Sequence, residues 1–218
     1  MTVRNIDNSQ RTAAKVAGIS GLLTVAIVVF ANYVLLNALI VPGNAVETAR
    51  NIVAHETQFR ITAVCFLIYS AGVIVQLAAL YLILRPVNQG LALVGALFRL
   101  VFALLWLLTT LNMLGALRHL GSASYLQVFE ADRLQTLARL HLAANFDDYY
   151  VGLPFFGLAA TVCSYLWLKS NYIPKSLSIF GLISSAWCVV CALVSSFSPT
   201  STKPLTITGS THRWLFSN

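Results

Sequence analysis

The sequence predicts an all-α integral membrane protein, a bundle of five transmembrane helices with two interfacial amphipathic helices on one face. Three observations lead to this prediction. Hydrophobic residues make up 58% of the chain and charged residues only 10%, whereas soluble domains carry about 25% charged residues. Five long runs contain no charged residue. No alternating pattern of about ten residues, as membrane barrels require, is present.

The five uncharged runs are each near or above the roughly 18 to 20 residues that cross the hydrocarbon core as a helix. They are residues 16–41, 61–84, 100–117, 149–168 and 176–202. The first run is longer than the apolar part of a secretory signal and lacks a small-residue cleavage pattern, so we expect a retained signal anchor. The predicted organisation is a cytoplasmic tail (1–15), a five-helix transmembrane domain (16–197) and a flexible C-terminal tail (198–218).

An odd number of spans puts the two termini on opposite sides of the membrane. The N-terminal side carries six basic residues against the single acid Asp7, with compact turns at Arg85 and between Lys169 and Lys175. Basic residues in short loops favour the cytoplasm. We therefore expect a multi-pass protein of the cell membrane with a cytoplasmic N-terminus. The net charge of +7 suits contact with the anionic lipid bilayer, and no nucleic-acid site is indicated.

Two segments between the spans have amphipathic patterns. Asn44 with Glu47 three residues later has the spacing of an N-terminal capping pair, so a helix is predicted from residue 45 towards the second span. Residues 124–145 alternate apolar and charged side chains at helical spacing. Both segments are predicted to lie at the membrane interface, and the second is predicted to run into the fourth span.

Four short motifs mark the turns and spans. They are Arg85-Pro-Val-Asn, Leu97-Phe-Arg-Leu, Phe155-Phe-Gly-Leu and Lys169-Ser-Asn-Tyr-Ile-Pro. Over residues 15–195 the chain resembles a family of small bacterial multi-pass membrane proteins catalogued as a domain of unknown function. The resemblance implies a helical membrane fold without implying an activity. Family members carry a Gly-Tyr element where this chain has Asp-Asp-Tyr-Tyr at 147–150, which suggests a specialised member.

Arg99 is the most informative single residue, because residues 91–117 are otherwise uncharged. A cation in the middle of a membrane costs about 2.5 to 3.5 kcal/mol even on the insertion scale, so it must face protein or water. From Leu91 it lies about 12 Å along the helix. It is predicted to bind a diphosphate or carboxylate head group or to hold a catalytic acid. The alternative is a structural partner for a carboxylate or for helix-end carbonyls.

Three acids are candidate proton donors. Asp147 and Asp148 are predicted to open the fourth span, and adjacent residues project about 100° apart on a helix. One of them would then face water and the other the bundle, where desolvation suits a general acid. Glu56 precedes the second span. Its spacing from Arg60 favours a surface ion pair, but convergence with an aspartate across the bundle mouth is the functional alternative.

Polar and aromatic side chains in or near the spans complete the candidate site. We assign substrate binding to Arg99, Tyr150, Tyr149, Trp106, Tyr69, Asn112, Arg60 and His55. The alternative for these residues is ordinary packing and interhelical hydrogen bonding. The four cysteines lie in spans and are interpreted as packing residues. No metal or cofactor motif is present, so neither is predicted.

The leading functional prediction is a membrane-embedded, metal-independent terpene cyclase that protonates an alkene or epoxide of a lipophilic, prenylated substrate. One of the three acids would donate the proton and another would orient it, while Tyr150 and Trp106 would stabilise the carbocation. The chemistry is similar in kind to that of membrane-bound terpene cyclases of meroterpenoid pathways. The alternative is a non-catalytic lipid binder, small transporter or accessory subunit, with Gly18, Gly21, Gly152 and Gly157 as candidate contacts for partner helices.

Overall fold

The computed structural model describes residues 8–41, 44–121 and 128–197, and over these residues the protein is all-α. Its helices are α1 (Asn8–Val29), α2 (Ala45–Ala54), α3 (Glu56–Leu84), α4 (Gln89–Leu120), α5 (Ala131–Ser170) and α6 (Lys175–Phe197), and a π-helical turn, η1 (Phe30–Leu36), continues α1. Five helices in the described part of the chain are long and apolar enough to cross a membrane. The predicted all-α class with five helices able to span a membrane is therefore confirmed for the described residues.

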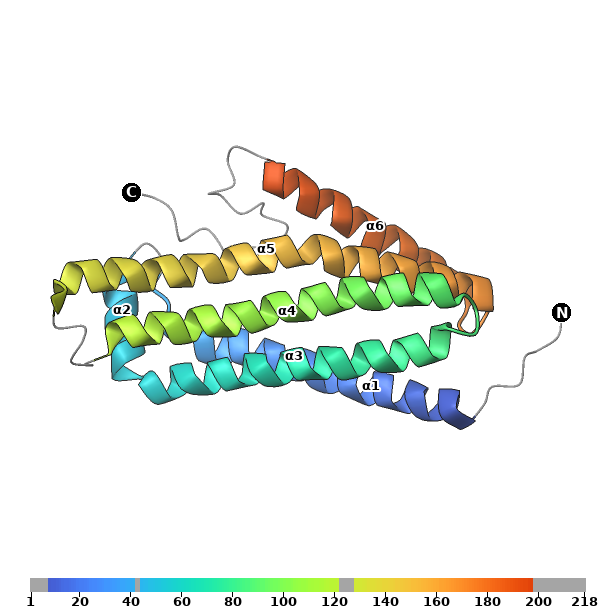
Figure 1. Ribbon diagram of the computed structural model, residues 1–218, viewed down its shortest axis with the longest axis horizontal. Coiled ribbons are helices and arrows are strands. Elements are labelled where there is room, and N and C mark those ends of the chain that lie inside the picture. The colour runs from blue at the N-terminus through green and yellow to red at the C-terminus, as the bar shows by residue number, and fades with distance from the viewer. Residues whose placement is uncertain (1–7, 42–43, 122–127, 198–218) are drawn as a thin grey trace.

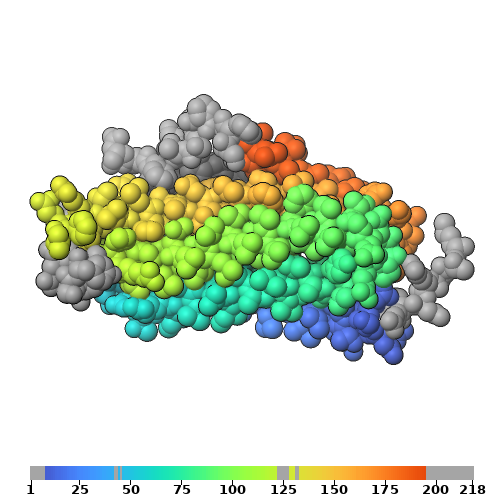
Figure 2. Space-filling view, in the orientation of Figure 1, coloured from blue at the N-terminus to red at the C-terminus, as the bar shows by residue number. Residues whose placement is uncertain are grey.

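The long helices run up and down in a row, and each packs against the next long helix of the chain (Figure 1). The order is α1, α3, α4, α5 and α6. The space-filling view shows the resulting elongated body, with α3, α4 and α5 side by side (Figure 2). The start of α1 and the α3–α4 and α5–α6 turns share one end, and α2 crosses the other. A cytoplasmic N-terminus stays a prediction.

The first amphipathic segment begins where the capping pair predicted. The Asn44 side chain accepts a hydrogen bond from the Glu47 backbone N–H at 3.0 Å and donates one to the Glu47 carboxylate at 3.1 Å. This confirms the predicted helix start. α2 buries Ile52 completely and packs against α3, α4 and α5. The π-helical turn η1 was not predicted, and the Gln58 side chain donates to the Leu35 carbonyl within it at 2.9 Å.

The second amphipathic segment, predicted to run into the fourth span, belongs to the same helix as that span. Residues 124–127 lie outside the described residues, and from Ala131 the chain forms one continuous helix to Ser170. Its first half follows α4, and Ala138 is 1% exposed. No glycine or proline interrupts residues 131–151, so nothing in that stretch ends the helix. Asp147 and Asp148 therefore lie inside α5, and the prediction that they open a helix is wrong.

α4 and α5 extend beyond the part needed for spanning. Their 32 and 40 residues correspond to about 48 and 60 Å of helix, against about 30 Å of hydrocarbon. Counted from Leu91, roughly 20 residues bring α4 through the core to Leu111. The last turns of α4 and the first turns of α5 thus form a paired extension at the α2 end.

Most of the glycines that were predicted to contact partner helices instead lie at close helix crossings inside the protein. A Cβ on Gly157 would lie 2.6 Å from a Val189 methyl and 3.2 Å from the Ser185 carbonyl oxygen, and Gly21 and Gly152 have similarly close neighbours inside the protein. Gly18 has nothing within 4 Å in the described structure. The α5–α6 crossing therefore depends on a missing side chain, as is common in membrane helix pairs.

Replacement of Gly157 by alanine tests this crossing. We expect Gly157→Ala to destabilise the protein by about 1 to 3 kcal/mol because the new methyl meets backbone that cannot rotate away. The matched control Gly18→Ala should be neutral or stabilising by up to about 1 kcal/mol, since alanine favours a helix. Thermal melting of the purified protein in detergent measures both. Equal melting temperatures for the two variants would contradict the packing.

Candidate functional site

Arg99 lies inside the bundle and contacts protein on several sides. Its guanidinium donates to the Gln76 side-chain oxygen of α3 at 2.5 Å and stands over the Phe156 ring of α5, 5.0 Å from the centroid. Its Nε is buried without a hydrogen-bond partner among the described residues. Neither of the two ion pairs in the described part of the chain involves Arg99. The predicted carboxylate partner is thus replaced by an amide and an aromatic face.

The same contacts connect four helices. A Cβ on Gly21 of α1 would lie 2.7 Å from the Gln76 amide nitrogen, so Gln76 is held between α1 and the Arg99 guanidinium of α4, with Phe156 of α5 beyond. A desolvated cation needs such a shell. This arrangement favours the structural alternative for Arg99, while its predicted role in substrate binding stays a prediction.

The three candidate acids have different surroundings. Glu56 pairs with Arg60 at 2.7 Å, and both side chains are half exposed or more, so the predicted surface ion pair is present. His55 is also exposed. Asp147 is exposed, whereas Asp148 is half-buried and accepts a hydrogen bond from the Asn112 amide at 2.7 Å. Of the three, Asp148 is the one that faces the α4–α5 interface.

A chain of hydrogen bonds leads from Asp148 to His141. An ionised carboxylate only accepts, so the Asn112 amide nitrogen faces Asp148 and its oxygen faces His141. His141 Nδ1 lies 3.2 Å from that oxygen and therefore donates its proton. The His141 ring stacks on His119 with centroids 5.2 Å apart. This chain links α4 to the extension of α5.

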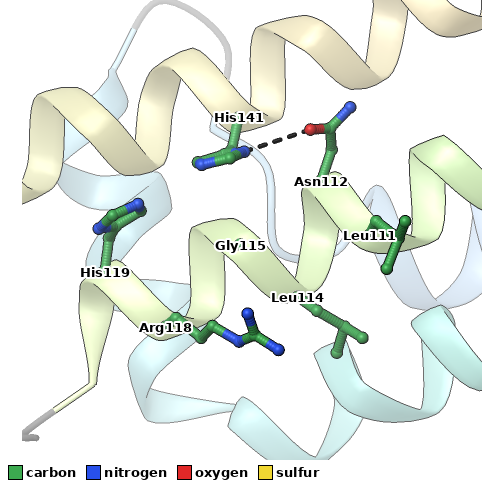
Figure 3. Close-up of a pocket in the computed structure, with 7 residues that line it drawn as sticks. All are labelled: Leu111, Asn112, Leu114, Gly115, Arg118, His119 and His141. Atoms are coloured by element: carbon green, nitrogen blue, oxygen red, sulfur yellow. Dashed lines mark hydrogen bonds between the residues drawn. The ribbon is translucent and has the colours of Figure 1, made fainter.

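An open groove of about 370 Å³ lies over this chain, at the end of α4 (Figure 3). It is lined by Leu111, Asn112, Leu114, Gly115, Arg118, His119 and His141. The His141 ring lies above Gly115, with Arg118 on another side of α4. None of these seven residues is acidic, and neither Glu56 nor the aspartates are among them. The groove combines leucines with an arginine and two histidines.

Of the residues that line the groove, only Asn112 was predicted as a site residue from the sequence. His141 sits against α4 because Gly115 has no side chain: a Cβ there would lie 2.8 to 3.1 Å from three ring atoms. One signal was available, since Asn112, Gly115 and His119 are spaced i, i+3 and i+7 and therefore share a helix face. The partner residue on α5 could not be identified from such spacing.

The predicted aromatic residues form a packed cluster. Trp106 is 8% exposed, and its ring makes edge contacts with those of Phe66, Tyr69, Phe102 and Tyr149. Tyr150 contacts Tyr149. The Trp106 indole N–H is buried without a partner in the described part of the chain. The residues that the structure describes include no group of three potential metal ligands.

Removal of Gln76 tests whether Arg99 is held by protein. Gln76→Leu should destabilise the protein by about 2 kcal/mol because it leaves a buried guanidinium without its acceptor. The double variant Gln76→Leu/Arg99→Met removes both polar groups and should recover most of that loss. Melting temperatures in detergent report both effects. A double variant that melts no higher than Gln76→Leu would show that Arg99 is held in another way.

Comparison with known proteins places the chain in a family. No curated protein and no solved structure matches it. The family described as "Domain of unknown function (DUF4386)" matches residues 16–212, which include all five candidate membrane spans except the first turns of α1. The family resemblance predicted from the motifs is thus shown at this level. The chain belongs to the DUF4386 family of proteins.

Proposed function

We propose that this protein binds a membrane lipid with an anionic head group in the groove at the end of α4. The observation that supports the proposal most is the composition of the groove. Arg118 supplies positive charge, His119 and His141 supply hydrogen-bonding groups, Leu111 and Leu114 supply an apolar surface, and none of the lining residues is acidic. An amphiphile with a charged head and a hydrocarbon chain matches such a lining.

The position of the groove along α4 supports a lipid as the ligand. It starts at Leu111, about where a hydrocarbon core measured from Leu91 ends. Leu111 is 61% exposed and would contact an acyl chain, while the exposed Arg118 lies two turns further, at the depth of lipid head groups. Arginine binds phosphate and carboxylate oxygens through several N–H groups at once. Both halves of a lipid would therefore meet matching surface.

Our second proposal is an acid-initiated terpene cyclase. It is supported by Asp148, which is half-buried in the α4–α5 interface and lies between Asp147 and Tyr149 in the sequence. In this proposal Asp148 donates the proton and Tyr149 and Tyr150 face the prenyl chain. The packing of Trp106 gives it less support, since four rings already surround that side chain. Glu56, tied to Arg60, would not take part.

Titration with lipid tests the first proposal. We expect the purified protein to bind anionic phospholipid more tightly than phosphatidylcholine in native mass spectrometry, where each bound lipid is counted by mass. Arg118→Gln should weaken binding roughly tenfold through loss of a charge-assisted contact. The control Arg139→Gln, an exposed arginine of α5 outside the groove, should stay within about twofold. Equal losses in both variants would indicate unspecific charge attraction.

Amide substitution separates the acids in the second proposal. If the protein is a cyclase, Asp148→Asn abolishes conversion of a prenylated substrate by membranes containing the protein, because the amide has no acidic proton to give. Glu56→Gln retains the activity. Product formation is followed by chromatography and mass spectrometry. Full activity in Asp148→Asn would refute this assignment.

A further inference from the structure

The hydrogen bonds around His141 determine what its free nitrogen offers to a ligand. Because Nδ1 carries the proton that is donated to Asn112, a neutral ring leaves Nε2 as an acceptor. The ring packs on Gly115, where a Cβ would lie 3.1 Å from Nε2, and both residues line the groove. No hydrogen bond to Nε2 is formed within the described part of the chain.

Asp148 determines, through Asn112, which ring nitrogen of His141 carries the proton. If the Asn112 amide were reversed, its oxygen would face a carboxylate and the two acceptors would repel. The 2.7 Å contact between Asn112 Nδ2 and Asp148 Oδ2 therefore selects the amide orientation, and the amide selects the imidazole tautomer. Such second-neighbour control of a histidine is common in functional sites. Asn112 is in this sense a positioning residue.

The lining of the groove thus includes both a hydrogen-bond acceptor, on His141, and a cation, on Arg118. Arg118 offers only donors and suits the oxygens of an anion. His119 has a buried Nδ1 without a partner in the described part of the chain. An unpaired lone pair is less costly to bury than an unpaired N–H, which leaves the proton of a neutral His119 on Nε2. A ligand that satisfies all three side chains carries an anion and, next to it, a hydrogen-bond donor.

We propose that the groove selects a phospholipid whose phosphodiester is extended by a hydroxyl-bearing head group, with the phosphate at Arg118 and a hydroxyl donating to His141 Nε2. This inference rests on the lipid-binding function proposed above and adds the chemistry of the head group. A glycerol phosphodiester has both parts. An ethyl phosphodiester has the same charge and lacks the hydroxyls, and a choline phosphodiester has no net charge and no donor.

Matched lipids test this directly. The full-length protein in detergent is titrated with phosphatidylglycerol, phosphatidylethanol and phosphatidylcholine of identical acyl chains, and bound lipid is measured by native mass spectrometry. We expect phosphatidylglycerol to bind roughly three- to tenfold more tightly than phosphatidylethanol, as one added hydrogen bond provides. His141→Phe, which keeps an aromatic ring beside His119, and Asn112→Leu, which releases the tautomer, should both abolish this preference.

Different outcomes test the hydroxyl contact and the binding of anionic lipid separately. Equal binding of phosphatidylglycerol and phosphatidylethanol by the wild-type protein, both above phosphatidylcholine, would overturn the hydroxyl contact and leave anionic-lipid binding intact. Equal binding of all three lipids would overturn both. Retention of the preference in His141→Phe would overturn the role of His141 even if Asn112→Leu failed to fold. Tight binding of soluble glycerophosphoglycerol alone would show that the source of the head group is not a lipid.

Discussion

His141 packs directly on the backbone of α4 at Gly115, and this contact fixes the geometry of the groove. Because Gly115 has no side chain, the ring reaches Asn112, and through Asn112 the half-buried carboxylate of Asp148. These contacts hold the extension of α5 against the last turns of α4 at a level beyond the spanning part of both helices. Polar groups that meet at the edge of the bilayer can keep contact with water, so their hydrogen bonds cost less desolvation than they would in the hydrocarbon.

The polar shell of Arg99 follows a different constraint. A charge within the spanning part of α4 cannot reach water through a short path, so neighbouring helices must solvate it. Gln76, Phe156 and the close approach of α1 at Gly21 provide this solvation. The protein therefore separates its polar side chains into a buried cluster around Arg99 and a groove at the end of α4. Arg99, the most informative residue of the sequence, lies in the less accessible of these two sites.

The sequence predicted the spans, the capped start of α2 and the Glu56–Arg60 pair because each depends on local spacing or on the cost of burying charge. The predicted start of the fourth span at Asp147 and Asp148 was wrong, although the absence of glycine and proline over 131–151 already indicated an uninterrupted helix. Pairing across helices could not be predicted. Which residue of α5 meets Gly115, and which residue of α3 meets Arg99, depends on the axial register of packed helices, and apolar helices fit together in many registers.

The family assignment and the groove bear on different levels of function. Membership in the DUF4386 family, described only as a domain of unknown function, assigns no activity. The side chains at the end of α4 support the proposal of what the protein binds. The order of Leu111, Leu114 and Arg118 along α4 matches the order of hydrocarbon chain and charged head group in a lipid. An aromatic core at Trp106 that is already filled gives a reactive cation less room.

The most direct test of the account is the position of a bound lipid on the protein. A photoactivatable phosphatidylglycerol with its reactive group at the glycerol backbone, incorporated into nanodiscs with the full-length protein, would be cross-linked and the modified peptides mapped by mass spectrometry. We expect cross-links concentrated between Leu111 and His119 of α4 and around His141 of α5, and their loss on competition with unlabelled phosphatidylglycerol. Cross-links spread evenly over the lipid-facing surfaces of α1 and α6, without competition, would contradict it.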